Sequence, residues 1–582
     1  MSGICGFVGE GDARLIDAML AAIPYRGDST DVAAHASCAL GYRWWSGRPG
    51  KSPGVHRDGE NLSACAGTFA PSVENPAADL ARTLGDSARM AVLDGAFAGA
   101  HWDDARKTLT LVRDPFGVRS LYYTRHKGVF YFASELKQLL AIPDLPVEAD
   151  YVALHKYLTF SFVPGEDVPV KGIKRLLPGR VARFYAGELK IEPYFQLVER
   201  LDLVLSDRAA AVAYTKKLLK DSVARRLGGE SEVGLALSGG LDSSAVAVLL
   251  KEAGVKVSAF SLDFGAQSVE RDQAREVAKS LEIPLTWVPF GVKQIEEHLP
   301  HLVWKLDLPF GDPVTGPQYV LAQSARQSGL TTLFNGEGGD QLFGGWTSKP
   351  MISAQLYSGL YEDQSREEMY LKSYHRFYGL EEQLYTEDFK AKIGSPGQRR
   401  ALLKPYLESG DASTFLNRVR FADIGLKGSQ NILPRAERAA NGWGLDVRVP
   451  LFDRALAEGS FRMPPQMKLH GACEKYVMKL SFQKRLPKEI VWRRKFGMSV
   501  PVTDWILKEL EGLSHVLLGP ETLARRGLFW PDYVQRLRQG QNDPQETRRR
   551  RIGERLWTLM MLEAWMRVFI DGRGKEPGGV WR

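Results

Sequence analysis

The segment SGGLDSS (238–244) combines residue types that bind phosphate groups and a divalent cation. It lies between the apolar run VGLAL (233–237) and a helical pattern that begins near Ser243. Two glycines let a backbone approach an anion closely, and hydroxyls together with the N–H groups at a helix N-terminus bind phosphate oxygens. Asp242 is placed to hold a Mg²⁺ ion that bridges phosphates. The candidate phosphate-binding residues are Ser238, Gly239, Gly240, Asp242, Ser243 and Ser244.

The same segment resembles the pyrophosphate-binding loop of the ATP pyrophosphatase (PP-loop) superfamily, and it lacks the spacing of a Walker loop. Enzymes of that superfamily break ATP between the α and β phosphates and leave AMP on the substrate. A second segment, FNGEGGDQLFGGW (334–346), is similar to the second nucleotide-site motif of the asparagine synthetase family. The resemblance implies that Asp340 supplies a second magnesium-binding carboxylate and that Glu337 faces the same site. The adenine side is then expected to be lined by backbone near Leu237, Leu262 and Gly336.

Two further segments extend the resemblance to an asparagine synthetase B-like family, in which a class II amidotransferase domain is fused to an ATP pyrophosphatase domain. They are RAERAANGWGLDVRVPLFD (435–453) and GACEKYVMKLSFQKRLPKEIVWRRKFGMSVP (471–501). Lysines of the second segment act on the phosphates and on the charged intermediate in that family, which implies catalytic roles for Lys495 and Lys475. Considered by itself, Lys475 fits a solvated helix position better. Glu337 completes the set of candidate catalytic residues.

The N-terminal part has the pattern of a β-rich domain. Short β-branched or aromatic runs bounded by turns predict strands at 108–114, 120–125 and 129–134 and a hairpin at 177–195. VRDPFGVRSLYY (112–123) and FASELKQLL (132–140) resemble the class II glutaminase domain. The resemblance implies an α/β protein whose N-terminal domain has an Ntn-hydrolase-like αββα fold.

The residues that would hydrolyse glutamine are missing from this domain. Members with that activity begin Met-Cys-Gly-Ile, and the exposed cysteine is the nucleophile while its own amine is the base. Here Ser2 stands in place of that cysteine, and Cys5 lies too far inside the chain. The N-G-E string expected at 64–75 is absent, and the expected H-R-G-P-D reads YRGDS at 25–29. An N-terminal serine can act as a nucleophile, but the three losses together predict a degenerate scaffold without glutaminase activity.

The rest of the chain alternates between helical and strand patterns. Helices are predicted at 208–227 and 270–281, and strands at 233–237, 257–264, 285–290 and 331–336. This alternation predicts a doubly wound parallel sheet with helical insertions. The expected domains are a degenerate glutaminase-like domain at 1–203, an ATP pyrophosphatase and amide ligase domain at 204–570, and a mobile tail at 571–582.

Composition restricts the remaining classes of function. A chain of 582 residues is expected to form two or more domains. Its four scattered cysteines form neither a disulfide framework nor a metal-binding spacing, which fits a reducing cytoplasm. The N-terminus lacks the pattern of a signal peptide, and no apolar run is long enough to span a membrane. The net charge of +8 suits an anionic substrate but equally fits a merely basic soluble protein. The basic run at 548–551 has no accompanying nucleic-acid recognition motif. We therefore expect neither a membrane nor a nucleic-acid partner.

Without glutaminase activity, the nucleophile must be free ammonia or an amine on the substrate. Relatives with this loss resemble two groups: lasso peptide cyclases, which join a peptide's N-terminal amine to an internal Asp or Glu side chain, and β-lactam or carbapenam synthetases, which close a small ring. Glu337 favours the cyclase, because the β-lactam-forming relatives tend to carry tyrosine there. The long aromatic stretch 346–434 favours it as a substrate lid, but a helical subdomain with buried tyrosines explains that stretch equally well.

The sequence thus predicts an ATP- and Mg²⁺-dependent lasso peptide cyclase. A side-chain carboxylate becomes an acyl-adenylate, the peptide amine closes a macrolactam, and Lys495 stabilises the transition state and the leaving AMP. The resemblance implies a precursor peptide, a leader peptidase and a leader-binding protein as partners. A β-lactam-type small-molecule ligase, an ammonia-dependent asparagine synthetase and an inactive binding scaffold are the alternatives. The last conflicts with the presence of Asp242, Asp340 and Lys495.

Overall fold

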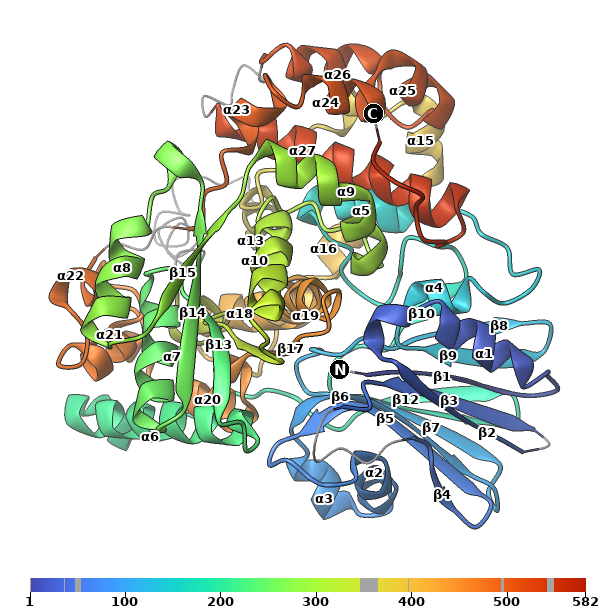
Figure 1. Cartoon of the computed structure of the whole chain (residues 1–582), viewed down its shortest axis with the longest axis horizontal. Helices are drawn as coiled ribbons and strands as arrows, with labels where there is room; N and C mark the ends of the chain where they lie inside the picture. Colours follow the sequence, from blue (N-terminus) through green and yellow to red (C-terminus); the bar gives the residue numbers. More distant parts are fainter. Residues whose placement is uncertain are drawn as a thin grey trace.

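The computed structural model describes residues 2–35, 37–47, 54–345, 365–395, 397–493, 497–541 and 549–581. An N-terminal part built on two β-sheets lies beside a C-terminal part built on one further sheet and many helices (Figure 1). The short helix η2 (Leu203–Ser206) joins the two parts. No helix within the described ranges is long and apolar enough to cross a membrane.

The N-terminal part consists of two six-stranded antiparallel sheets. One has the strand order β10-β8-β9-β1-β3-β2, and the other has the order β12-β11-β7-β6-β5-β4. The strands are β1 (Ser2–Val8), β2 (Ser29–His35), β3 (Cys38–Trp44), β4 (His56–Asp58), β5 (Asn61–Phe69), β6 (Gly95–Asp103), β7 (Thr108–Arg113), β8 (Tyr122–His126), β9 (Val129–Ala133), β10 (Ile173–Arg175), β11 (Arg180–Tyr185) and β12 (Glu188–Pro193).

Strand β5 illustrates why the two sheets stack. Successive side chains of a strand point to opposite faces, so one strand can serve two cores. Leu62 and Ala64 pack into the cluster between the sheets, whereas Cys65 and Phe69 pack with Leu80 of a covering helix. The helices of this part are α1 (Arg14–Ala21), α2 (Pro76–Leu84), α3 (Ser87–Val92), α4 (Leu136–Leu139) and α5 (Tyr151–Phe160). Helices α1 and α4 contact the first sheet and α2 contacts the second, which confirms the predicted αββα layers (Figure 1).

The C-terminal part contains a five-stranded parallel sheet in the order β15-β14-β13-β16-β17. Its strands are β13 (Glu232–Ala236), β14 (Lys256–Asp263), β15 (Leu285–Pro289), β16 (Thr332–Phe334) and β17 (Asp446–Arg448). Helices flank both faces, which confirms the predicted doubly wound sheet (Figure 1). These helices are α6 (Arg208–Leu227), α7 (Leu241–Glu252), α8 (Arg271–Ser280), α9 (Val292–Leu306), α10 (Thr315–Gln327), α11 (Gly339–Phe343) and α19 (Leu433–Asn441).

Helical insertions make up most of the remaining chain. Between α11 and α19 the structure has α13 (Arg366–Lys372), α14 (Glu381–Leu384), α15 (Glu387–Lys392), α16 (Gln398–Ala401), α17 (Lys404–Leu407), α18 (Phe415–Ala422) and the π-helical η5 (Asp423–Ile432). After β17 follow α20 (Arg454–Arg462), α21 (Tyr476–Phe482), α22 (Lys488–Val491), α23 (Val502–Ile506), α24 (Glu511–Leu518), α25 (Pro520–Arg526), α26 (Pro531–Arg538) and α27 (Arg550–Met566). Phe377, Tyr385 and Phe389 of the first insertion are fully buried, as expected for a helical subdomain.

Two sequence expectations differ from the structure. Strands β1 to β6, β10 and β17 were not predicted, because segments such as β5 and β6 are rich in Ala and Gly and carry few of the β-branched residues that signal a strand. The tail was expected to be mobile, yet Trp304 Nε1 donates a hydrogen bond of 2.9 Å to Gly574 O. Arg573 donates to Leu145 O at 3.1 Å, so this part of the tail packs against the N-terminal part.

Candidate active site

The two predicted nucleotide loops meet at neighbouring strands. Strand β13 leads into the loop 238–244 and β16 leads into the loop 335–340, and the two strands pair in parallel. The chain continues from β13 to β14 on one side, whereas β16 lies on the other side. The strand order therefore reverses between β13 and β16, and ligands of open parallel sheets bind at the carboxyl ends of strands at such a point.

Hydrogen bonds between residues close in sequence fold the loop 238–244 back on itself. Ser238 Oγ lies 3.1 Å from Ser243 Oγ and accepts a hydrogen bond from Gly240 N at 3.2 Å. Ser244 Oγ donates to Gly240 O at 2.8 Å. Gly239 has φ +75°, and a Cβ there would stand 2.6 Å from Ala274 N. The loop thus needs glycine at this position, and it ends at the N-terminus of α7, where backbone N–H groups can meet an anion.

The second loop packs directly on the first. A Cβ on Gly336 would lie 2.5 Å from Ser243 N, and a Cβ on Gly339 would lie 2.3 Å from Asp242 Cγ. Real Cβ atoms do not approach so closely, so these glycines are required by the contact between the loops. The packing brings the Asp242 and Asp340 carboxylates to one place, although almost 100 positions separate them in the sequence.

Lys475 joins the two carboxylates. Its Nζ lies 2.5 Å from Asp242 Oδ2 and 2.6 Å from Asp340 Oδ1, and its side chain is 3% exposed. The residue immediately precedes α21 and has φ 54°, a backbone conformation that is uncommon for a residue with a side chain. The interpretation of Lys475 as a solvated helix residue is wrong, because a lysine this deeply buried requires the carboxylate partners that it has here.

The carboxylates fit a magnesium ion bound jointly with phosphate. Asp242 Oδ1 is buried, and no hydrogen-bond partner for it is found in the part of the chain that the structure describes. The described residues also contain no group of three His, Cys, Asp or Glu side chains that would form a site made of protein ligands alone. Mg²⁺ is typically held by one or two carboxylates, with substrate phosphates and water completing its coordination.

Glu337 lies at the side of the second loop and is tied to its neighbours. Gln318 Nε2 donates to Glu337 Oε1 at 3.1 Å, and Arg435 Nη2 lies 3.8 Å from the same oxygen. Arg435 Nε donates to Gln318 Oε1 at 3.1 Å, and Arg435 Nη1 lies 2.8 Å from Asp312 Oδ2. A chain of polar contacts thus leads from the nucleotide loops to Asp312. Sequence reasoning missed Gln318 and Asp312, which lie in no motif, while Arg435 begins the third recognised segment.

Of the other predicted site residues, the structure describes Leu237, Leu262 and Gly336 but not Lys495. Leu237 follows β13, is buried, and donates its N–H to Phe260 O at 2.9 Å. Leu262 lies in the neighbouring strand β14 and is half-buried, so both leucines and Gly336 lie near the same edge of the sheet. Lys495 lies outside the described residues. Its predicted catalytic role stays a prediction.

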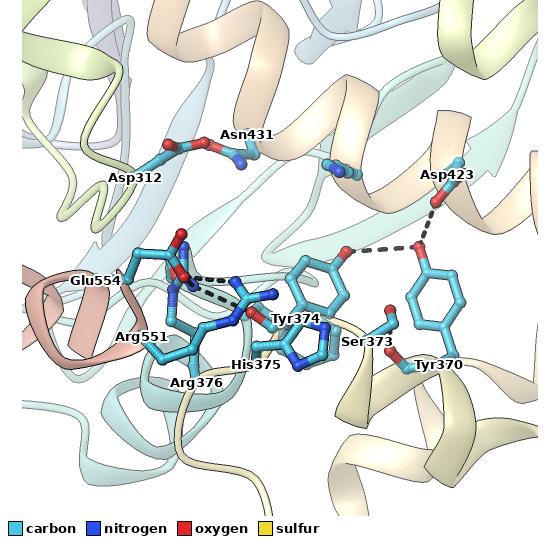
Figure 2. A pocket seen from close by; sticks show the side chains of 13 residues that line it. Asp312, Tyr370, Ser373, Tyr374, His375, Arg376, Asp423, Asn431, Arg551 and Glu554 are labelled. Atoms are coloured by element: carbon cyan, nitrogen blue, oxygen red, sulfur yellow. Dashed lines mark hydrogen bonds and ion pairs between the residues drawn. The ribbon is translucent and has the colours of Figure 1, made fainter. Parts of the chain in front are cut away.

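A pocket lies at the far end of this chain of polar contacts, and Asp312 is one of its lining residues. Its volume is about 140 Å³, and we call it the Tyr374 pocket after a residue of the first insertion. Residues of α5, the first insertion, η5 and α27 line it. Figure 2 shows Arg376 and Arg551 beside Glu554, and Asp312 and Asn431 above them in that view. All of the lining residues lie outside the two nucleotide loops.

Around Ser2, in the N-terminal part, the polar groups are buried and bonded to other protein groups. Ser2 is 3% exposed, and its Oγ accepts a hydrogen bond from Gly67 N at 3.1 Å. Arg26, from the YRGDS string, donates to Ser2 O at 3.2 Å and to Glu437 Oε1 of the C-terminal part at 2.9 Å. Cys5 is fully buried, and burial raises the pKa of its thiol well above the ordinary value. Cys5 is therefore held as a neutral core residue rather than a nucleophile.

Comparisons with known proteins find relatives for both parts of the chain. Residues 215–567 match the Asparagine synthase family, and residues 78–195 match the family described as Glutamine amidotransferase domain. The glutamine-hydrolyzing asparagine synthetase 1 of Bacillus subtilis (strain 168) is 27% identical over 508 residues, which cover 83% of this chain and 78% of that protein. A putative glutamine-hydrolyzing asparagine synthetase of Mycobacterium tuberculosis (strain ATCC 25618 / H37Rv) is 26% identical over 524 residues, with coverages of 82% and 77%.

A further relative is the glutamine-hydrolyzing asparagine synthetase 3 of Bacillus subtilis (strain 168), 28% identical over 434 residues, which cover 69% of this chain and 67% of that protein. The amidotransferase match begins at residue 78 and therefore does not test Ser2 or the string at 25–29. The synthase match takes in more than half of the chain, including both nucleotide loops, Lys475 and Arg435. On this match the chain belongs to the asparagine synthase family, a family of ATP-dependent ligases that form carbon–nitrogen bonds.

Proposed function

We propose that this protein joins a carboxylate to an amine through an acyl-adenylate, and that the amine does not come from glutamine. The observation that carries the first half is the convergence of Asp242 and Asp340 on Lys475 beneath the loop 238–244. Two carboxylates and an ammonium beside a phosphate-binding loop provide what cleavage of ATP between its α and β phosphates requires. That requirement is charge compensation on both sides of the breaking bond.

In this proposal the loop 238–244 binds the pyrophosphate part of ATP. Asp242 and Asp340 would hold Mg²⁺, which neutralises phosphate charge when it is bound. The substrate carboxylate attacks the α phosphorus, pyrophosphate leaves, and the amine then attacks the acyl-adenylate. Lys475 shifts from its two carboxylates toward phosphate oxygens as these arrive, and Lys495 compensates charge during acyl transfer. Holding both reactants in near-attack geometry contributes much of the rate.

The exclusion of glutamine rests on the N-terminal residues. Ser2 replaces the expected cysteine, and its hydroxyl accepts from a backbone N–H while the residue is almost fully buried. Arg26 uses its guanidinium on Ser2 O, Glu135 and Glu437 rather than on a ligand. A side chain whose donors are all taken by protein has little left for a substrate.

The finer proposal is that the product is a macrolactam in a peptide, made from a precursor peptide with a leader peptidase and a leader-binding protein as partners. Glu337 favours it over a β-lactam-type ligase, and the tie of Glu337 to Gln318 and Arg435 gives that carboxylate a positioning role. The first insertion lines a pocket next to this tie, which suits a substrate larger than aspartate. Ammonia-dependent synthesis of asparagine is the second candidate, supported by the similarity to asparagine synthetases.

The test supplies wild-type protein with ATP, Mg²⁺ and each of two substrate sets: candidate precursor peptides freed of their leaders, and aspartate with ammonia. Pyrophosphate release and mass spectrometry are followed together. A macrolactam is lighter than its linear peptide by one water and resists aminopeptidases. Lys495→Ala should slow formation of that product about 10²–10³-fold while ATP binding stays unchanged.

The outcomes separate the candidates. A dehydrated, aminopeptidase-resistant peptide supports the cyclase. Asparagine formed from aspartate and ammonia, with no dehydrated peptide, would overturn the cyclase and keep the ligase. No substrate-dependent pyrophosphate release from either set would contradict both.

A further inference from the structure

The Tyr374 pocket has donors that the protein does not use. Arg551 is 4% exposed, and its Nη1 lies 2.6 Å from Glu554 Oε2. Its Nε and Nη2 are buried, and neither has an acceptor anywhere in the described ranges. Burying N–H groups of a guanidinium without acceptors is costly, so these two atoms point to a ligand with acceptor oxygens.

Lys427 adds a second donor to the same pocket. Its side chain is half-buried, and within the described chain no carboxylate forms an ion pair with it. Arg376, by contrast, is occupied: Nη1 lies 3.0 Å from Glu554 Oε2, and Nε donates to Ser161 Oγ at 2.6 Å. The unused donors of the pocket therefore belong to two cations, Lys427 and Arg551.

Three carboxylates line the pocket: Asp423 accepts a hydrogen bond from Tyr370 Oη at 2.9 Å, and Asp312 and Glu554 have cationic partners. Burial would raise the pKa of Asp312, but Arg435, Arg376 and Lys427 hold it below its ordinary value. Burial would likewise raise the pKa of Glu554, yet Arg376 and Arg551 lower it. Asp312 and Glu554 are thus ionised and compensated, and an added anion would share Lys427 and Arg551 with them.

One acceptor in the pocket also lacks a donor. Asn431 is 3% exposed, and its Oδ1 is buried without a hydrogen-bond partner among the described residues. Figure 2 shows Asn431 and Asp312 at the same side of the pocket. An N–H of the ligand would satisfy this oxygen. The unused groups thus require an anion with an N–H donor close to it, a combination that amino acids and peptides carry.

The pocket communicates with the nucleotide loops but does not include them. Asp312 contacts Arg435 at 2.8 Å, Arg435 contacts Gln318 at 3.1 Å, and Gln318 contacts Glu337 at 3.1 Å. A group bound in the pocket therefore lies beyond these side chains from Asp242 and Asp340. It cannot be the carboxylate that is adenylated, because that carboxylate must reach the α phosphorus.

We propose that the Tyr374 pocket binds a second, unreacted carboxylate of the substrate together with an adjacent N–H, so that the substrate is a peptide or amino acid with at least two acidic groups. This inference rests on the proposed ligase function and specifies its substrate class. Lys427 and Arg551 receive the carboxylate, and Asn431 Oδ1 accepts the N–H. Recognition of a group away from the reaction centre would orient the carboxylate that reacts.

Three small probes test this without ATP: N-acetylglycylglycine, its C-terminal amide, and N-acetylglycylsarcosine, which lacks the second N–H. Binding to full-length protein is measured by ligand-observed NMR titration. We expect the acid to bind about tenfold or more tightly than the amide, because a charge-assisted hydrogen bond is lost in the amide. The sarcosine analogue should bind more weakly than the glycine acid.

Lys427→Gln and Arg551→Lys should each weaken binding of the acid about tenfold and leave binding of the amide unchanged. Lys372→Gln, at an exposed position of α13, is the matched control and should leave the acid unaffected. Thermal unfolding checks folding, and if Arg551→Lys is unstable, Lys427→Gln decides alone. Equal binding of acid and amide, or wild-type affinity in folded Lys427→Gln, overturns the proposal.

Inorganic phosphate distinguishes a peptide site from a plain anion site. Phosphate that displaces the acid at equal concentration, with glycine and sarcosine probes bound equally, would leave only an anion site and refute the peptide assignment. Failure of the ligase itself would appear elsewhere, as missing pyrophosphate release despite intact binding of the acid. The two hypotheses therefore fail in different measurements.

Discussion

Two buried cations, Arg26 in the N-terminal part and Lys475 in the C-terminal part, each lie between two carboxylates. Arg26 contacts Glu135 and Glu437, and Lys475 contacts Asp242 and Asp340. Every nitrogen of the Arg26 guanidinium has a protein acceptor. At Lys475, by contrast, one oxygen of Asp242 is buried without a partner in the described chain.

This contrast holds for the two cations themselves and not for the whole Arg26 cluster, in which Arg119 Nε and Arg438 Nε are buried without an acceptor in the described chain. A fully satisfied network can rigidify a fold, whereas a site for a ligand keeps some groups unpaired until the ligand arrives. The Arg26 cluster crosses between the two parts of the molecule. Burial would raise the pKa of Glu437, but Arg26 and Arg119 hold it below its ordinary value. The N-terminal domain thereby fixes α19, the helix that carries Arg435.

The largest effect is expected from the nucleotide site. Asp242→Asn and Asp340→Asn should each lower substrate-dependent pyrophosphate release about 10³-fold or more, because a carboxylate that compensates phosphate charge is lost. Asp272→Asn, on the exposed face of α8, is the matched control and should retain activity. Near-normal release in either site variant would show that these carboxylates do not bind the nucleotide.

The next effect concerns the ammonium between the carboxylates. Lys475→Met should slow pyrophosphate release about 10²–10³-fold. It should also make the melting temperature depend on Mg²⁺, since the two carboxylates then lack a shared cation. Unfolding followed by circular dichroism with and without MgCl₂ measures this, and exposed Lys484→Met provides the control. A melting temperature of the Lys475→Met protein that does not respond to Mg²⁺ would count against a shared cation site.

At the Arg26 cluster we expect a mutation to lower the stability of the fold rather than the catalytic activity. Arg26→Met removes one cation from a buried network in which Lys137 still contacts Glu135 and Arg119 still contacts Glu437. We therefore expect a loss of about 3 kcal/mol, the lower end of the range for breaking a buried ion pair. Urea unfolding should show this decrease, whereas Arg183→Met, which breaks a pair with Glu192 that is largely exposed, should cost about 0–1 kcal/mol. If Arg26→Met were as stable as the wild type, the cluster would not hold the two parts together.

The smallest effect is expected at Ser2. Ser2→Ala removes the acceptor of Gly67 N–H and should cost about 1–3 kcal/mol, the typical cost of leaving a buried donor unpaired. Ligase activity should be unchanged, and neither form should release glutamate from glutamine. Glutamate release by the wild type that disappears in Ser2→Ala would show that Ser2 hydrolyses glutamine. The N-terminal part would then be catalytic rather than only structural.

Local sequence was sufficient for the nucleotide loops and for four of the five strands of the sheet that holds them, β13 to β16. An apolar run, two glycines, small hydroxyls and an aspartate must occur together to bind phosphate at a strand–helix junction, and all of these residues are neighbours in the chain. For the same reason helix α6 was predicted with the bounds that it has, Arg208–Leu227. Serine at position 2 is likewise readable from the sequence, because it concerns a single position, and the loss of glutaminase activity inferred from it stays a prediction.

Tertiary structure alone decided how the charged residues pair. Lys475 and Asp242 are 233 positions apart, so no local pattern distinguishes a buried bridging lysine from a solvated one. Arg26 and Glu437 are 411 positions apart, and the Tyr374 pocket draws on segments from Phe160 to Glu554. Burial and ion pairing depend on which distant segments pack together, and that packing sums many weak contacts along the whole chain.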